Sequence, residues 1–226
     1  MKLSWRTELP QWAMIAGMCV LAAVTWAWAP DRIPMHWNIA GQIDGYGGKL
    51  EGLLMPPALA LGIYLLMLLS PRIDPGRKSY ALFTGSYNTI RLAVVTVLAA
   101  LYGVTHLTLR GYPIDVATVV PLITGAMLVV LGNVMGKIRP NWLVGIRTPW
   151  TLSSKMAWVK THRLGGWLFI LSGLGLMAAS VVHASWAAMA CFGLLILSVV
   201  AAYAYSYRVW RDDPDKIPPA GTLPGV

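Results

Sequence analysis

Long apolar segments separated by shorter polar ones dominate the chain. Six apolar segments are each long enough, at about 1.5 Å per helical residue, to cross a hydrocarbon core about 30 Å thick. We expect all six to be helices, because a backbone amide in lipid must find its hydrogen-bond partner within its own span. The pattern therefore predicts an all-α integral membrane protein with six transmembrane helices, at residues 12–29, 53–70, 88–109, 116–134, 165–183 and 186–206.

Composition indicates the same class of protein. Hydrophobic residues make up 57% of the chain and charged residues only 12%, and the mean hydropathy is +0.60. A soluble domain carries about 25% charged residues, so this chain lacks the charge to cover a surface in water. The two cysteines, Cys19 and Cys191, lie within apolar segments, which argues against a disulfide framework.

Basic residues predict how the helices are oriented. A net charge of +9 would suggest a nucleic-acid partner for a soluble protein, but in a membrane protein the position of each charge carries the information. Six spans put both termini on one side, and only Arg32, Lys49 and Arg110 of the 18 Lys and Arg then fall on the other side. This excess predicts that both termini are cytoplasmic, and we expect no direct contact with nucleic acid.

The tryptophans agree with this orientation, because they lie near the predicted ends of the spans. Aromatic rings of this kind anchor membrane proteins at headgroup depth. Seven are expected at the inner boundary and four at the outer boundary: Trp5, Trp12, Trp142, Trp150, Trp158, Trp167 and Trp210 inside, and Trp26, Trp28, Trp37 and Trp186 outside.

The loop between the first two spans, "PDRIPMHWNIAGQIDGYGGKLEG" at residues 30–52, is expected to form an ordered outer cap. Asp44-Gly45 is a turn signal that would stand between two short strands. His36, Asn38 and Asp44 supply groups for binding a ligand, and histidine changes charge near neutral pH. Alternatively, His36 and Asn38 only fix the shape of the loop through bonds to its backbone.

Three histidines, His36, His106 and His183, fall at the outer ends of different spans. Imidazole is a common zinc ligand, so the three could converge on a metal ion. No ligand spacing supports such a site, and we predict neither a metal nor a cofactor.

The largest polar segment on the other side, residues 135–164, contains "NWLVGIRTPWTLSSK". Leu152, Met156 and Val159 recur at helical spacing, which predicts a short interfacial helix from about residue 151 along the inner leaflet. Arg139 and Arg147 are suited to gripping a carboxylate or a phosphate. Alternatively, these cations only enforce the topology.

Within the predicted spans, the most conspicuous polar side chain is that of Asn133. It is flanked by Gly132-x-x-x-Gly136, a spacing that lets another helix approach closely. Asn133 would then contribute to helix packing, or alternatively line a pore or substrate path.

Three parts of the chain can be distinguished. Residues 1–135 form an N-terminal membrane domain with four spans, and residues 136–207 contain the polar segment and two further spans. Residues 208–226 are rich in proline and glycine, which predicts a disordered cytoplasmic tail.

Two motifs resemble those of a known family. "GNVMGKIRPNWLVGIRTPWTLSSKMAWVKTHRLGGWLF" resembles the signature of the SdpI family of bacterial membrane immunity proteins, and "IPMHWNIAGQIDGYGGK" resembles the small N-terminal domain that accompanies it. The inner motif falls on Asn141, Gly145, Arg147, Thr148, Pro149, Trp150, Thr151, Trp158, Thr161, His162, Gly165 and Gly166, and the outer motif falls on His36, Asn38, Gly41, Asp44 and Lys49.

The resemblance implies a multi-pass protein of the bacterial cytoplasmic membrane that gives resistance to a secreted peptide toxin. It also implies signal transduction through a cytoplasmic transcriptional repressor that the protein recruits. In that case the outer motif binds the toxin, and the inner residues Asn141, Arg147, Thr148, Trp150, Thr151, Trp158, Thr161 and His162 report the event or dock the repressor.

Two other functions stay open. A membrane hydrolase acting on a peptide or lipid could use Asn141, Arg147, Ser153, Ser154 and His162, but no known catalytic spacing organises these residues. A small transporter or channel would need polar residues along a path, and the spans offer few beyond Asn133. Immunity requires no catalysis.

Overall fold

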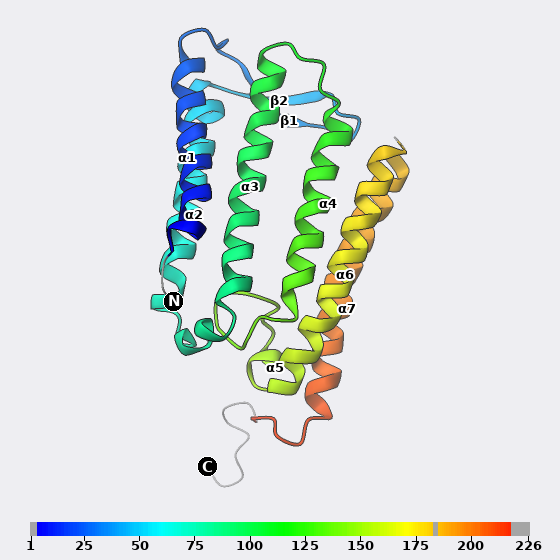
Figure 1. Cartoon of the computed structure of the whole chain (residues 1–226). Coiled ribbons are helices and arrows are strands. Elements are labelled where there is room, and N and C mark those ends of the chain that lie inside the picture. Colours follow the sequence, from blue (N-terminus) through cyan, green and yellow to red (C-terminus); the bar gives the residue numbers. More distant parts are fainter. Residues whose placement is uncertain (1–3, 183–184, 218–226) are drawn as a thin grey trace.

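The computed structural model describes residues 4–182 and 185–217 (Figure 1). The chain is mostly helical, and six of the described helices are long and apolar enough to cross a membrane. This confirms the predicted number of membrane-length helices. They are α1 (Trp5–Trp26), α2 (Met55–Ile73), α3 (Thr84–Leu109), α4 (Val116–Met135), α6 (Lys155–Val181) and α7 (Ser185–Arg211).

The long helices run side by side, with α1 and α2 on one side of α3 and with α4, α6 and α7 on the other (Figure 1). Helices α4 and α6 touch through their backbones. A Cβ on Gly132 would lie 2.5 Å from the carbonyl oxygen of Gly166, and one on Gly125 would lie 2.6 Å from that of Gly173. Glycine at these four positions therefore permits the close contact. Gly136 was also predicted to let another helix approach closely, but it is not in the tight contact, since only the Cα of Arg163 lies near it.

A β-hairpin covers one end of the bundle. Strand β1 (Ile33–Trp37) pairs antiparallel with β2 (Ile43–Gly47), so the expected all-α fold carries one small sheet. The predicted turn at Asp44-Gly45 is wrong, because both residues lie within β2 and Gly45 faces His36. Glycine is needed there for close packing, since a Cβ would lie 2.8 Å from that of His36. A π-helical segment, η1 (Leu50–Leu54), follows the hairpin and leads into α2.

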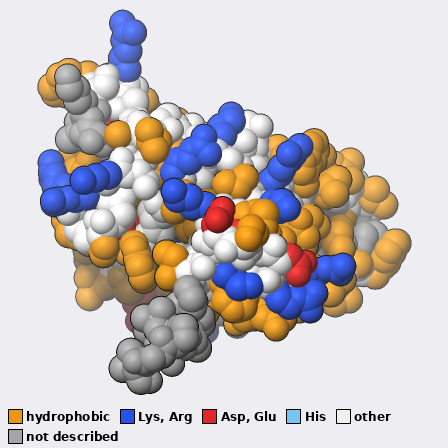
Figure 2. All heavy atoms as spheres, turned by 90° about the horizontal axis from the view of Figure 1, so that it is seen from below, with side chains coloured by type: hydrophobic (Ala, Val, Ile, Leu, Met, Phe, Trp, Pro, Cys, Tyr) orange, Lys and Arg blue, Asp and Glu red, His pale blue; other side chains and the backbone are white. Residues whose placement is uncertain are grey.

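The opposite end carries many lysine and arginine side chains (Figure 2). It contains the 3₁₀-helix η2 (Arg77–Leu82), the loop after α4, and the four-residue helix α5 (Pro149–Leu152). The predicted interfacial helix from about residue 151 has different bounds. The side chain of Ser154 accepts a hydrogen bond from the Ala157 N–H and so begins a new helix. Met156 and Val159 consequently belong to α6, which continues without a break to Val181.

A hydrophobic core lies near this basic end, between α3, α4 and α6. It is formed by Tyr80, Phe83, Tyr87, Ile90, Val134, Met135, Ile138 and Trp158. Trp158 was expected at the membrane boundary, but its side chain is fully buried. Its indole N–H donates to the Ile138 carbonyl at 2.9 Å, so its polar atom is satisfied inside the protein.

Part of the predicted disordered tail is ordered. Helix α7 continues to Arg211, and the backbone N–H of Ile217 donates to the Ser153 carbonyl at 2.9 Å. The segment after α7 therefore lies against the loop that contains α5. Residues 218–226 fall outside the described part of the chain.

Candidate functional site

The polar residues of the outer cap shape the hairpin. Oδ1 of Asn38 accepts from the backbone N–H groups of Ala40 and Gln42, at 2.9 and 3.0 Å, which closes the turn. Gly41 takes a positive φ of 75° in this turn, and a Cβ there would lie 3.0 Å from the backbone nitrogen of Ala117. Asn38 and Gly41 therefore set the shape of the turn and seat it against α4.

His36 and Asp44 face each other across the hairpin, with Nδ1 and Oδ1 2.5 Å apart. Both side chains are exposed, so this contact contributes little to stability. Lys49 donates to the Trp26 carbonyl at 3.4 Å and lies 4.0 Å from Asp31, which connects the hairpin to the end of α1. The structure thus brings the four predicted outer residues together on one small unit.

A pocket of about 770 Å³ lies beneath this unit. Most of its wall is apolar, and the polar side chains are few. They include His36 and Asn38 from the hairpin, Glu51 from η1, and Thr105 and Tyr102 from α3. The apolar wall comes from the hairpin, from α2, α3 and α4, and from α7, and includes Ile39, Met55, Leu59, Leu98, Leu101 and Val120. An apolar cavity with a few polar groups is the usual form of a ligand site.

At the basic end, Asn141 and Asp74 fold the inner loop. Oδ1 of Asn141 accepts from the Leu143 and Val144 N–H groups, and its amide donates to two loop carbonyls. Asp74, just after α2, accepts from the Trp142 N–H at 3.1 Å and from the Tyr80 hydroxyl at 2.9 Å. Burial, together with the bond to Asp74, raises the pKa of Tyr80 above its ordinary value. Asp74 therefore ties the loop to the α2–α3 connection.

His162 is held in one orientation by its two ring nitrogens. Nε2 accepts from the Ile146 N–H at 3.0 Å, so Nδ1 carries the proton and donates to the Trp158 carbonyl at 2.8 Å. The ring stacks on that of Trp158, with centroids 4.1 Å apart. Gly145 has a φ of 113°, and a Cβ there would lie 2.3 Å from Nε2. His162 is consequently a buried support for the loop backbone.

The threonines begin α5 and join it to α7. The Thr148 hydroxyl accepts from the Thr151 N–H, and the Thr151 hydroxyl accepts from the Thr148 N–H, which forms a capping box. Thr148 also contacts the Ser206 hydroxyl at 3.0 Å. The ring of Trp150 packs against those of Tyr203 and Tyr207, with centroids 4.9 and 5.1 Å away. Thr161 is fully buried on α6.

Ser154 and Asp213 add a second connection to the segment after α7. The Ser154 hydroxyl donates to the Asp213 carboxylate, and this hydrogen bond lowers the pKa of Asp213. The Ser153 hydroxyl donates to the Pro149 carbonyl at 2.7 Å. Neither serine contacts His162, whose ring nitrogens bond to backbone groups. Within the described residues, the two serines of the hydrolase alternative therefore have no histidine partner.

Arg147 differs from its buried neighbours because its side chain is exposed. One guanidinium nitrogen donates to the Trp142 carbonyl at 2.5 Å, which leaves the rest of the fork on the surface. Asn133 is also exposed, on α4, far along the chain from the cap residues. The predicted site residues therefore form two groups at opposite ends of the bundle, one in the outer cap and one in the inner loop.

A metal-binding group of three His, Cys, Asp or Glu does not occur in the described part of the chain, and His183 lies outside it.

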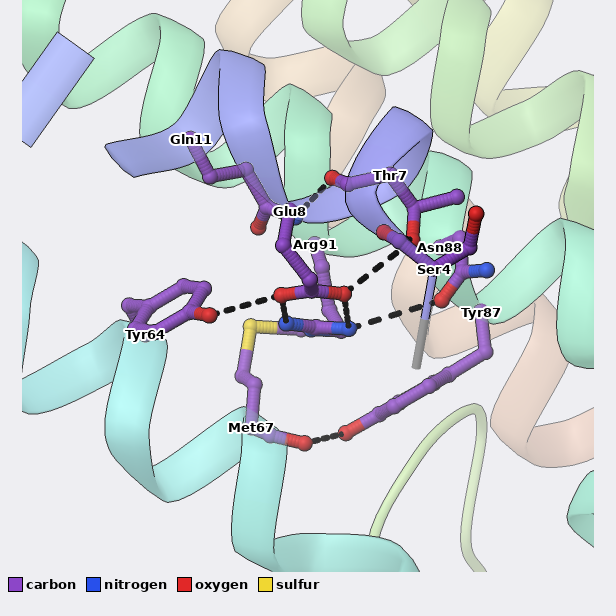
Figure 3. Close-up of polar contacts among 9 residues, drawn as sticks. All are labelled: Ser4, Thr7, Glu8, Gln11, Tyr64, Met67, Tyr87, Asn88 and Arg91. Carbon is purple, nitrogen blue, oxygen red and sulfur yellow. Dashed lines mark hydrogen bonds and ion pairs between the residues drawn. The ribbon is translucent and has the colours of Figure 1, made fainter. Parts of the chain in front are cut away.

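A buried ionic cluster joins α1, α2 and α3, and the sequence pattern did not predict it. Figure 3 shows Glu8 of α1 facing Arg91 of α3, with the two guanidinium nitrogens 2.7 and 3.1 Å from the carboxylate oxygens. The Tyr64 hydroxyl donates to the same carboxylate at 2.6 Å, and Asn88 lies 3.4 Å from Arg91. The Arg91 side chain is fully buried. The available signal in the sequence was an arginine within a predicted span, Arg91, whose partner Glu8 lies 83 residues earlier.

Two family models match the chain over the segments that carry the outer cap and the inner loop. The model of the SdpI/YfhL protein family matches residues 137–206, which contain the inner loop, α5, α6 and most of α7. Over these residues the chain is similar to the SdpI/YfhL family. A domain of unknown function, DUF1648, matches residues 13–61, which contain most of α1, the hairpin and the start of α2. Both resemblances predicted from the motifs are thus confirmed.

A curated relative covers most of the chain. The immunity protein SdpI of Bacillus subtilis (strain 168) is 24% identical over 188 residues, which are 83% of this chain and 88% of that protein. No solved structure matches the chain. The family match, the distant homology to a named immunity protein and the six membrane-length helices indicate a multi-pass protein of the bacterial membrane, in contact with lipid.

Proposed function

We propose that this protein gives its bacterium immunity to a secreted peptide toxin by binding an apolar part of the peptide under the hairpin. The observation that carries the proposal is the pocket of about 770 Å³ beneath the predicted outer cap. The homology to a named immunity protein supports the same function. An apolar segment of a peptide suits an apolar cavity with few polar groups.

The basic end of the bundle supports the proposed orientation. Lysine and arginine gather on the end of the bundle opposite the hairpin (Figure 2), and positive charge is retained on the cytoplasmic side of bacterial membranes. The hairpin and its pocket then lie at the outer boundary, where a secreted peptide arrives. His36, Asn38 and Glu51 are placed to bind polar groups of the peptide at the pocket's rim.

The inner loop would transmit the event or dock a cytoplasmic repressor. Its buried residues bond mostly to one another and to the loop backbone, so they hold a fixed surface and do not themselves contact a partner. Arg147 is exposed on this surface. A guanidinium fork is suited to binding a carboxylate of a partner protein.

Cells of the native bacterium that lack this gene are expected to die in spent medium from the parent strain, and expression of the chain should restore survival. Val120→Trp, which places a large ring in the pocket, should abolish the rescue because the cavity no longer admits the peptide. Survival in a dilution series of the medium measures the effect, and we expect at least a tenfold loss of protection.

The matched control is Val130→Trp, which adds the same ring to the exposed face of α4, away from the pocket. It should protect as well as the parent, at equal amounts of protein in the membrane. Equal protection by both variants would exclude the pocket as the toxin site. Peptide recovered after incubation with purified protein should keep its mass, since a changed mass would establish the hydrolase alternative.

Arg147→Ala should fold and reach the membrane but lose protection or the recruitment of its cytoplasmic partner. The side chain donates a hydrogen bond to the Trp142 carbonyl and is otherwise exposed, so its removal should change the fold little. Arg139→Ala, which removes an exposed cation of the same loop, is the control and should behave as the parent. Normal survival and partner recruitment with Arg147→Ala would remove this residue from the mechanism.

A further inference from the structure

A second hollow lies between α4 and α6, near the basic end of the bundle. It has a volume of about 220 Å³ and is lined by Gly132, Gly136 and Gly166, by Asn133 and Arg163, and by Trp167. The glycines leave space where side chains would otherwise fill the crossing. At roughly 30 Å³ for each water molecule in the liquid, the hollow has the volume of several waters and is large enough for a phosphate group.

The polar side chains of this hollow come from both helices. Asn133 is on α4 and Arg163 is on α6, and both are exposed. Among the residues that the structure describes, neither the Asn133 amide nor the Arg163 guanidinium makes a hydrogen bond or ion pair with the protein. No carboxylate lines the hollow, whereas Lys137 follows Gly136 and Lys160 lies one turn before Arg163. The hollow therefore suits an anion.

The depth of the hollow fits a lipid headgroup. Helix α6 has 27 residues, so it is about 40 Å long and exceeds a hydrocarbon core of about 30 Å. The excess of about 10 Å places at most the first two turns of α6 beyond the core. Arg163 is in the third turn, at the boundary, from which its long side chain can reach the headgroups. Trp167, one turn further along, is 60% exposed, as expected for an indole that contacts lipid at the boundary.

We propose that this hollow binds the phosphate of an anionic phospholipid from the leaflet at the basic end. Arg163 donates two parallel hydrogen bonds to the phosphate oxygens, and the Asn133 amide donates a third from the opposite helix. The Trp167 ring lies against the lipid's glycerol backbone. A lipid held this way bridges α4 and α6 where their backbones meet, and it gives an exposed arginine in a membrane-length helix its counter-ion.

Native mass spectrometry of the full chain in detergent tests the site by titration with phosphatidylglycerol and, separately, with phosphatidylcholine. We expect phosphatidylglycerol to bind more tightly, and Arg163→Gln to weaken it by about tenfold or more, the loss of a charge-assisted contact. Arg139→Gln removes the same charge from the nearby loop and should weaken binding less than threefold. An equal loss of phosphatidylglycerol affinity in the two variants would show that the lipid is held only by general electrostatic attraction, and it would overturn the proposed site.

A further variant and a competition experiment complete the test. Gly136→Leu fills the hollow without removing charge, and only the Arg163 Cα lies near the added atom, at 3.9 Å; it should also weaken phosphatidylglycerol binding about tenfold. Unchanged binding in this variant would overturn the proposal even if Arg163→Gln failed to fold. Inorganic phosphate should not displace the lipid from the parent protein, and displacement at similar concentrations would reassign the hollow to free phosphate.

Discussion

Glu8→Ala should destabilise the protein by about 3–5 kcal/mol, the typical effect of removing one partner of a buried ion pair. The Arg91 guanidinium is fully buried, and it makes two contacts with the Glu8 carboxylate. Without that carboxylate it keeps its charge and loses its counter-ion, and the Tyr64 hydroxyl loses its acceptor. Because whole domains have a stability of only about 5–15 kcal/mol, the loss is large. Unfolding of the purified protein in mixed micelles, followed by circular dichroism against denaturing detergent, measures it.

Two comparisons separate the buried pair from charge in general. The double variant Glu8→Met with Arg91→Leu removes both charges and should recover most of the lost stability, since apolar residues replace buried pairs well. Asp212→Ala breaks the exposed contact between Arg211 and Asp212, 3.3 Å long, and should change stability little. If Glu8→Ala unfolds like the parent, then the pair does not hold α1 and α3 together.

The membrane-length helices could be predicted because lipid imposes both their length and their apolar character. Their ends were less predictable. The first span was expected from residue 12, yet α1 begins at Trp5, because Glu8 is neutralised by Arg91 across 83 residues. A single sequence does not show such a partner. The break at Ser153 and Ser154 was missed for a related reason, since the apolar spacing of Leu152, Met156 and Val159 continues through it.

The hairpin was predicted with the wrong turn because the local signal had two explanations. Asp44-Gly45 is a frequent turn pair, but here Gly45 makes room for His36 on the opposite strand. The turn is formed instead by Asn38 and Gly41, whose side-chain acceptor and positive φ serve that purpose. The contact between Gly45 and His36 therefore determines which of the two glycine-containing segments forms the turn.

The candidate site was predictable as two groups of residues but not as surfaces. The motifs located the polar residues of the cap and the inner loop, and their roles in binding stay predictions. Asn141, Thr148 and His162 are buried, and their polar atoms bond to the loop backbone and to neighbouring side chains. The outer pocket was missed, because its wall combines apolar residues from five separate elements that read as ordinary span residues.

The inner loop gains rigidity from partners that are distant in the chain. Asp74 accepts from the Trp142 N–H, Thr148 contacts Ser206, and Ser154 donates to Asp213. These contacts connect the loop to the α2–α3 connection on one side and to α7 on the other. Under the proposed function, a ligand in the outer pocket would act on the surface that carries Arg147 through a shift of α3 or α7, because these contacts join the loop to both sides of the bundle.

Gly132→Ala should destabilise the protein by about 1–3 kcal/mol, although alanine favours helices more than glycine does. The added Cβ would lie 2.5 Å from the Gly166 carbonyl oxygen and 3.0 Å from the Ile170 nitrogen. Both are backbone atoms of α6, so neither can move without separating the two helices. The same unfolding measurement in mixed micelles would detect the change.

Gly103→Ala is the matched control, because Gly103 is also inside a membrane-length helix but has no atom within 4 Å of an added Cβ. This variant should be as stable as the parent or more stable by about 0.5–1 kcal/mol, the usual gain in helix propensity. Equal behaviour of the two alanine variants would mean that α4 and α6 do not touch through their backbones. A loss at Gly132 alone would instead show that glycine there sets the distance between the helices, which also determines the size of the hollow beside Arg163.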